Sequence, residues 1–354
     1  MAIKGKNKIT SSKHDESPVA KRREMPLQHY VENDLKQISK IINVSHQKSA
    51  SPYLETTGVK LPGAIYGAAT VSRAHLLSEE YLLNYKGNSI DFGPLHGLAE
   101  YGRLEVRSAF ALIEKKEKEL DARSECIELP EPQRIEASFD ALVRARRSRS
   151  QMTGETLSLE QLSTLLFYGD GVTDRKEVIG PGELSGAWPS DSLGEPDPIH
   201  VRSAPSAGAL YPIDLYLLLR NVRQVDDGLY RYRPNSHRLL HVKPLSEADW
   251  KLHEADAATW GTNFDASKVN VLISHVYSLH KNSRKYGELG LAFGFMEAGM
   301  ISQNIHLAAG ALGLASNCIG SGIKTKREKL LGIDGLSQHC LHQMAIGLPK
   351  TQHA

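Results

Sequence analysis

The stretch Ala204-Pro205-Ser206-Ala207-Gly208-Ala209-Leu210-Tyr211-Pro212 decides how this chain is interpreted. Four of its nine residues carry at most a methyl group, and a proline stands near each end. Small side chains leave backbone N–H groups open to a ligand, and the prolines restrict the loop before a ligand arrives. The stretch therefore suits the approach of a flat or anionic cofactor. A tight turn that leads into a core element has the same composition, so both interpretations stand for the stretch taken alone.

The segments after this loop predict strands. The apolar run Ile213 to Leu219 has the composition of a strand or of the start of a buried helix. Alternation over residues 228–232 and 239–242 predicts a β-hairpin that turns at Pro234-Asn235. Residues 269–275 predict a further, buried strand.

Residues 292–314 predict the most distinctive helix of the chain. Met296, Met300 and Leu307 lie near one face, and Gly313 is placed to end the helix. The opposite side carries small residues, namely Ala298, Gly299, Ser302, Ala308 and Ala311. A helix that is apolar or small all round is typical of a buried helix, here packed closely against another helix.

Two helices are predicted upstream of the loop. Phe139 and Val143 indicate an amphipathic helix that ends in the basic run 144–150. Leucines between Leu157 and Leu166 indicate a second helix, which stops at Gly169.

Composition divides the chain into three parts. Residues 1–26 are polar and rich in lysine and predict a disordered tail, with a basic contact arm as the alternative. Residues 27–130 predict a small, mostly helical subdomain that packs on something larger. Pro130 and Pro132 mark a domain boundary, and we expect the domain that follows to span residues 136–354.

The region between the second helix and the small-residue loop is rich in glycine, proline and serine over residues 177–200. Loops of this length inside a domain are usually functional or disordered. We expect a lid or a peptide-contact surface with Trp188 as its anchor.

Length and charge narrow the classes of function. The 354 residues carry a formal net charge of only +2, which gives no reason to expect a nucleic-acid ligand. The three cysteines form no CxxC pair and no ligand cluster with histidines, so neither a disulfide framework nor a metal is expected. The absence of an apolar run of membrane-spanning length predicts a cytoplasmic protein without membrane contact.

Two short motifs bear on chemistry. Arg146-Arg147-Ser148 follows the first predicted helix and suits a phosphate, because guanidinium forks and a hydroxyl are good donors to phosphate oxygens. Taken alone, it is equally a solvated basic face. In Lys285-Tyr286, an ammonium beside a phenol favours the phenolate, which makes the pair a candidate acid or base. Taken alone, this is also a common surface dipeptide.

The order of these motifs is more specific than any one of them. After Arg146-Arg147-Ser148 and the small-residue loop come Gly228–Tyr232, Arg284–Glu288, Glu297–Gly299, Gln303-Asn304, Ile319-Gly320, Leu330–Asp334 and Ile346–Pro349. The ordered set resembles the nitroreductase-like flavoproteins and, more narrowly, the SagB-type dehydrogenases. The latter are the azoline oxidases of thiazole- and oxazole-modified peptide pathways. The resemblance covers residues 136–354.

The resemblance implies a fold, a cofactor and a set of site residues. The fold is α+β, with a central antiparallel sheet flanked by helices, and FMN binds at the interface of a homodimer. Lys285 and Tyr286 match the catalytic pair of such oxidases. The positions that match the cofactor site are Arg146, Ser148, Ser206, Ala207, Gly208, Leu210, Gln303, Asn304, Ile319 and Gly320.

The implied reaction converts a thiazoline or oxazoline of a ribosomally made precursor peptide into an azole, as in antibiotic biosynthesis. It transfers a hydride to N5 of FMN and a proton to a base, for which Lys285 and Tyr286 are both open, and dioxygen reoxidises the flavin. The expected partners are the precursor peptide and a cyclodehydratase that forms the azolines. In this family context, residues 27–130 are expected to contact a partner, a leader peptide or the second copy of the dimer.

Departures and alternatives follow from the same comparison. Ser150 and Met152 replace an arginine and an aromatic residue of many relatives, and Ala209 replaces an asparagine of the broader family. The alternative enzyme is an FMN-dependent reductase of nitroaromatics or quinones that uses a nicotinamide donor. A flavin-free subunit that scaffolds a peptide-modifying complex is the alternative outside enzymes.

Overall fold

The computed structural model describes Tyr81 and residues 125–176, 199–257, 264–320 and 322–350. The predicted tail, residues 1–26, most of the predicted N-terminal subdomain and the segment 177–198 with Trp188 lie outside the described residues. Contacts divide the chain into two compact units, Met1–Tyr85 and Lys86–Ala354. Every described element except the helical residue Tyr81 belongs to the second unit.

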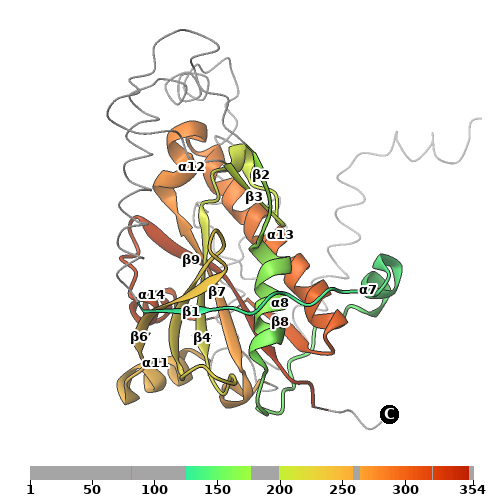
Figure 1. The fold of residues 1–354 in the computed structure, drawn as a ribbon. Helices are drawn as coiled ribbons and strands as arrows, with labels where there is room; N and C mark the ends of the chain where they lie inside the picture. Colours follow the sequence, from blue (N-terminus) through green and yellow to red (C-terminus); the bar gives the residue numbers. More distant parts are fainter. Residues whose placement is uncertain (1–80, 82–124, 177–198, 258–263, 321, 351–354) are drawn as a thin grey trace, which may run out of the picture. The chain divides into compact units, whose positions relative to one another are not determined.

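A seven-stranded antiparallel sheet forms the centre of this unit (Figure 1). In spatial order its strands are β1 (Cys126–Glu128), β6 (Arg238–Pro244), β5 (Gly228–Arg233), β4 (Ile213–Leu219), β7 (Val271–Ser278), β9 (Gln338–Gly347) and β8 (Ala315–Ile319). A separate pair is formed by β2 (Val172–Lys176) and β3 (Ile199–Arg202). The short strand β1 precedes Pro130 and pairs with β6, so the sheet includes residues upstream of the proline-rich segment.

The strand predictions are confirmed. Helices cover both faces of the sheet, so its central strands are apolar on both sides. Every residue of β4 is buried, which explains why its sequence is apolar throughout and does not alternate. The hairpin of β5 and β6 turns after Arg233, as the Pro234-Asn235 signal predicts. The predicted strand 269–275 corresponds to β7.

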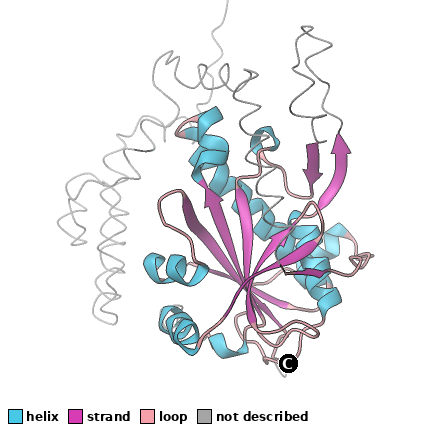
Figure 2. Cartoon of the chain, turned by 60° about the vertical axis from the view of Figure 1, so that its left-hand side comes forward, coloured by secondary structure: helices cyan, strands magenta, loops and turns pink. Residues whose placement is uncertain are grey.

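Helices cover the two faces of the sheet (Figure 2). On one face, Leu217 and Ile273 pack with residues of α8 (Leu159–Asp170) and α13 (Leu289–Ala311). On the other face, Leu272 packs with Leu330 of α14 (Lys324–Leu331) and with Trp250 of α11 (Glu247–Ala257). The fold is therefore mixed α+β with a central antiparallel sheet flanked by helices, as predicted.

Local sequence signals account for the start of α8 and for its close packing on α13. The Ser158 side chain accepts from the Gln161 N–H, and the Gln161 side chain accepts from the Ser158 N–H, which is a capping box. At Gly169 a Cβ would come within 2.7 Å of the Ile305 side chain, so this glycine allows the close approach of α8 and α13. The prediction of a closely packed helix pair is confirmed at this point.

Two predictions about helix burial are wrong among the described residues. The helix α7 (Phe139–Ala145) forms, but it has no buried residue, and Phe139 is 74% exposed. In α13 the small residues Ala298, Ser302 and Ala308 are buried, but Gly299 is exposed, and Met296 and Met300 are 50% and 41% exposed. Sequence periodicity identifies an apolar face, but it does not say what covers that face.

No described helix combines the length and the apolarity that crossing a bilayer requires. Cys126, Cys318 and Cys340 are free thiols. The remaining helix, α12 (Leu279–Tyr286), connects β7 to α13 and ends with the Lys285-Tyr286 pair.

Candidate functional site

The loop between β3 and β4 has an unusual backbone. Gly208, Ala209 and Tyr211 have φ angles of 63°, 54° and 44°, in the left-handed region that side chains other than glycine disfavour. Ser206 anchors the turn, since its hydroxyl accepts from the Tyr211 N–H at 2.9 Å and its carbonyl accepts from the Ala209 N–H at 3.1 Å. Strain of this kind persists where neighbouring structure fixes it, and it is concentrated at functional sites.

The Lys285-Tyr286 pair lies directly against this loop. A Cβ added to Gly208 would be 2.6 Å from the Lys285 Nζ and 2.6 Å from the Tyr286 hydroxyl. Since both atoms are that close to one point, they are no farther apart than twice this distance. Any residue larger than glycine at 208 would displace one of them. The structure therefore brings together two motifs that lie 77 residues apart in the sequence.

The end of α12 holds the tyrosine in place. The Tyr286 ring contacts the edge of Phe293 of α13, with ring centroids 5.0 Å apart and an interplanar angle of 89°. The Lys285 Nζ lies 5.2 Å from the centroid of the Tyr286 ring. An ammonium and a phenol that meet at a glycine backbone can together hold or move a proton at a bound substrate.

The predicted phosphate residues form a second group. Arg146 follows α7, and the next residues run beside β8, where the Arg149 N–H donates to the Ser316 carbonyl at 2.9 Å. Burial, and after it the charge of Arg146, lowers the pKa of His306 of α13. The Arg146 guanidinium is therefore close to the place where α13 meets β8.

This second group fits the phosphate of a flavin nucleotide by the chemistry of its donors. Within the ranges that the structure describes, neither the Arg146 guanidinium nor the Ser148 hydroxyl forms a hydrogen bond or ion pair. Gly320 is exposed, and a Cβ there would have open space around it, so its backbone is accessible. Guanidinium, hydroxyl and backbone N–H are the donors that phosphate oxygens accept from.

The other predicted cofactor residues differ in what they can offer. The Ile319 side chain is 4% exposed and packs in the core, so only its backbone can reach a ligand. Gln303 is exposed on the same side of α13 as Met300. The Asn304 amide donates to the Ser203 carbonyl at 3.4 Å, which ties α13 to the start of the small-residue loop. Ala207 and Leu210 lie half-buried in the loop itself.

The helices α12 and α7, which lead to the two groups, lie toward opposite ends of α13 (Figure 1). Tyr286 contacts Phe293, whereas Arg146 is close to His306. Phe293 and His306 are thirteen positions apart, which corresponds to about 20 Å of helix. Between them, α13 exposes Phe295, Met296 and Met300, each by 41% or more.

Sequence reasoning missed a group of buried charges behind the loop. Arg202 pairs with Asp170 at 2.8 Å and stacks on the Tyr211 ring at 4.2 Å. Glu297 of α13 is 3% exposed and is hydrogen-bonded to the Ser206 hydroxyl. Burial raises the pKa of Glu297 to about 7 and that of Asp170 to about 6. An acid inside the most apolar helix of the sequence was the available signal, and only its burial shows that it is part of the site.

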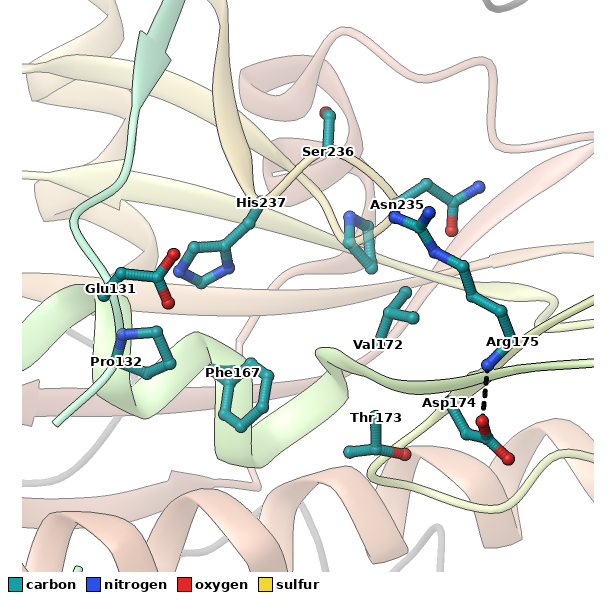
Figure 3. Close-up of a pocket in the computed structure, with 11 residues that line it drawn as sticks. Glu131, Pro132, Phe167, Val172, Thr173, Asp174, Arg175, Asn235, Ser236 and His237 are labelled. Carbon is teal, nitrogen blue, oxygen red and sulfur yellow. Dashed lines mark hydrogen bonds between the residues drawn. The ribbon is translucent and has the colours of Figure 1, made fainter. Parts of the chain in front are cut away.

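A separate cavity of about 360 Å³ lies beyond the end of α8 (Figure 3). None of its lining residues is a predicted site residue; they are Glu131, Pro132, Phe167, Val172–Arg175 and Pro234–His237. The Glu131 carboxylate and the His237 ring lie side by side on one side of it, and Arg175 lies on the other. Among the residues that the structure describes, no group of three or more histidine, cysteine or acidic side chains could hold a metal ion.

Comparison with known proteins gives a family match. The model of the Nitroreductase family matches residues 143–348. The chain is 30% identical over 207 residues to a protein of Methanocaldococcus jannaschii named as a candidate nitroreductase, which covers 58% of this chain and 89% of that protein.

Two solved structures are similar to this chain at lower identity. One is a candidate nitroreductase of Ralstonia eutropha, with 21% identity, a TM-score of 0.47 and coverage of 64% of this chain and 90% of that one. The other belongs to the Escherichia coli microcin synthetase McbBCD complex with truncated pro-MccB17 bound. It has 20% identity, a TM-score of 0.45 and coverage of 79% of this chain and 100% of that one. Similarity at this level says nothing about a substrate.

Proposed function

The chain belongs to the nitroreductase family, and from this premise we propose that it is an FMN-dependent dehydrogenase that oxidises thiazolines or oxazolines of a peptide to azoles. The family is one of nitroreductase-like flavin oxidoreductases, whose members typically use FMN. The observation that carries the proposal is the meeting of the Lys285 ammonium and the Tyr286 hydroxyl at Gly208. A hydride exchange between a nicotinamide and a quinone needs no such proton-accepting pair.

The proposed reaction removes two hydrogens from the azoline ring. Bound FMN supplies an acceptor for the hydride. The protein's own part is to place the ring beside the small-residue loop and to take the second hydrogen as a proton. Lys285 and Tyr286 are the candidates for that proton, and both reach the same point of the loop.

We further propose that the working enzyme is a homodimer in which α13 packs against its symmetry mate. The exposed residues Phe295, Met296 and Met300 supply an apolar face, and Gly299 between them allows close approach. Antiparallel packing of two α13 helices would place Arg146 of one protomer near the Gly208 loop of the other. Arg146 and Ser148 of one protomer and the small-residue loop of the other would then hold one FMN together.

The proposal is tested by the absorbance spectrum of the purified protein, recorded before and after addition of an azoline-bearing peptide. We expect oxidised-flavin absorbance that bleaches with the peptide, and a loss of about 2 Da per azole by mass spectrometry. A cyclodehydratase would form the azolines of the ribosomally made precursor peptide, and we propose a complex with that enzyme. A yellow protein that leaves azolines unchanged and consumes a nicotinamide would instead support a small-molecule reductase. A colourless protein that does not take up FMN would contradict both.

A further inference from the structure

We propose that Glu297 is a positioning residue that fixes the strained loop against Lys285 and Tyr286 by binding both ends of that loop. This inference rests on the function proposed above, because it assigns Glu297 a part in placing the same proton-accepting pair. Glu297 lies on the buried side of α13, between the core of the protein and the loop that begins at Ser206.

The contacts of the Glu297 carboxyl define this role. At the start of the loop it is hydrogen-bonded to the Ser206 hydroxyl. At the end of the loop it accepts from the Ile213 N–H at 3.4 Å, where β4 begins. The same Ser206 hydroxyl oxygen accepts from the Tyr211 N–H at 2.9 Å. Glu297 therefore connects both ends and, through Ser206, one of the left-handed residues inside.

The loop requires such a connection because its backbone is strained. Gly208, Ala209 and Tyr211 would relax toward ordinary φ angles if their neighbours did not hold them. Relaxation would move the Gly208 backbone, which the Lys285 ammonium and the Tyr286 hydroxyl now contact. Glu297 touches neither of these side chains in any contact that the structure gives, so its effect on them passes through the loop.

The charges around Glu297 make its protonation sensitive to pH near neutrality. The charged groups that face it are Asp170 of α8, which raises the pKa of Glu297, and Arg202 of β3, which lowers it. The next charge is Asp214 of β4, whose pKa is kept well below its usual range by two cations, Arg231 and Lys281.

The ionised form of Glu297 is the form that holds the loop. Its hydrogen bonds with Ser206 and with the Ile213 N–H both lower the pKa of Glu297, so both favour the carboxylate. The loop should therefore be held most firmly above neutral pH.

Hydrogen exchange of the full-length flavin-loaded protein tests the inference without any substrate. The variants are Glu297→Leu, which loses both bonds, and Glu297→Gln, which keeps a neutral acceptor of the same shape. The matched control is Glu328→Leu, which removes a buried glutamate of α14 on the other face of the sheet. We expect E297L to raise exchange of the segment 206–213 by at least tenfold, E297Q to raise it less, and E328L to leave it unchanged.

Turnover supplies the second readout. We expect kcat on an azoline peptide to fall in the order wild type, E297Q, E297L. An ionisation near pH 7 in the pH profile of the wild-type kcat should disappear in E297Q.

The positioning role would be overturned if segment 206–213 of E297L exchanged at the same rate as in the wild type, whatever the turnover. If E297L does not fold, Ser206→Ala breaks the same connection, and unchanged exchange at residues 211–213 would overturn the role equally. A wild-type protein inactive on azolines contradicts the proposed function, and the exchange result still decides the role of Glu297.

Discussion

The two ends of α13 differ in whether the polar groups around them find partners within the same chain. At the N-terminal end, a strained loop, buried charges and the candidate proton carriers Lys285 and Tyr286 are held by contacts within the protein. At the other end, the Arg146 guanidinium and the Ser148 hydroxyl form no hydrogen bond or ion pair among the described residues, and Gly320 is exposed. The first end is organised to hold groups in fixed positions, as catalysis requires. The second end offers unused donors, as binding of an anion requires.

The largest expected effect comes from changing Lys285 or Tyr286, at the N-terminal end of α13. We expect Tyr286→Phe and Lys285→Met to lower kcat on an azoline peptide by about 10²–10⁴-fold, because each removes a group that can carry the proton. Flavin content should stay at the wild-type level. Lys329→Met, at an exposed position of α14, is the matched control and should keep full activity. Loss of flavin together with activity would show that the pair serves cofactor binding rather than proton transfer.

A smaller effect is expected from filling the contact point. Gly208→Ala places a methyl group 2.6 Å from both reactive atoms and at a φ of +63°, so it should lower turnover by at least tenfold and unfolding free energy by about 1–3 kcal/mol. Gly310→Ala is the control, because that glycine is helical with no atom near its Cβ position. It should stabilise the protein by about 0.5–1 kcal/mol. Equal melting temperatures and activities of the two variants would contradict the described contact at Gly208.

At the C-terminal end of α13 we expect Arg146→Ala to weaken FMN binding by about 10–100-fold. This corresponds to loss of one charge-assisted hydrogen bond. Arg147→Ala should change the affinity little, because the Arg147 guanidinium already donates to the carbonyls of Arg144 and Arg146. Fluorescence titration of FMN into the apoprotein measures both. A larger loss in the Arg147 variant would reverse the assignment of the phosphate donor.

A further effect concerns the pH dependence of stability. The folded-state pKa of Glu297 is raised to about 7 from an ordinary value of 4.5, so the folded protein binds this proton more tightly than the unfolded chain does. The free energy of unfolding therefore falls as pH rises from 4.5 toward 7, because the buried carboxyl ionises, although the hydrogen bonds that hold the loop favour the ionised form. We expect the stability of Glu297→Gln relative to wild type to increase by up to about 3 kcal/mol between pH 5 and pH 8. A pH-independent difference in melting temperature would contradict the buried state of Glu297.

The sequence predicts much of the sheet and little of what covers it. Strand β4 and helix α8 follow from local patterns that need no tertiary information, an apolar run and a capping box. The exposure of Met296 and Met300 does not follow, because an apolar helix face has the same pattern whether a core or a second chain covers it.

The same contrast holds within the candidate site. The motif order predicts Gly208, Lys285 and Tyr286, and the structure brings them together, while their catalytic role stays a prediction. The part of Glu297 was missed because it depends on Ser206 and Asp170, which are remote in sequence and near only in the fold. A buried acid is recognisable only when its neighbours are known.

The central claim is that each site combines Arg146 of one protomer with Tyr286 of the other. Mixing two inactive variants tests this claim most directly. Arg146→Ala and Tyr286→Phe are co-expressed with different tags, and the mixed dimer is purified at a limiting FMN concentration. If each site takes Arg146 from one protomer and Tyr286 from the other, every mixed dimer has one intact site. We predict that it regains about half of the wild-type activity per dimer, as two-fold symmetry requires. A mixed dimer no more active than its two parents would show that each chain builds its site alone and would contradict the account.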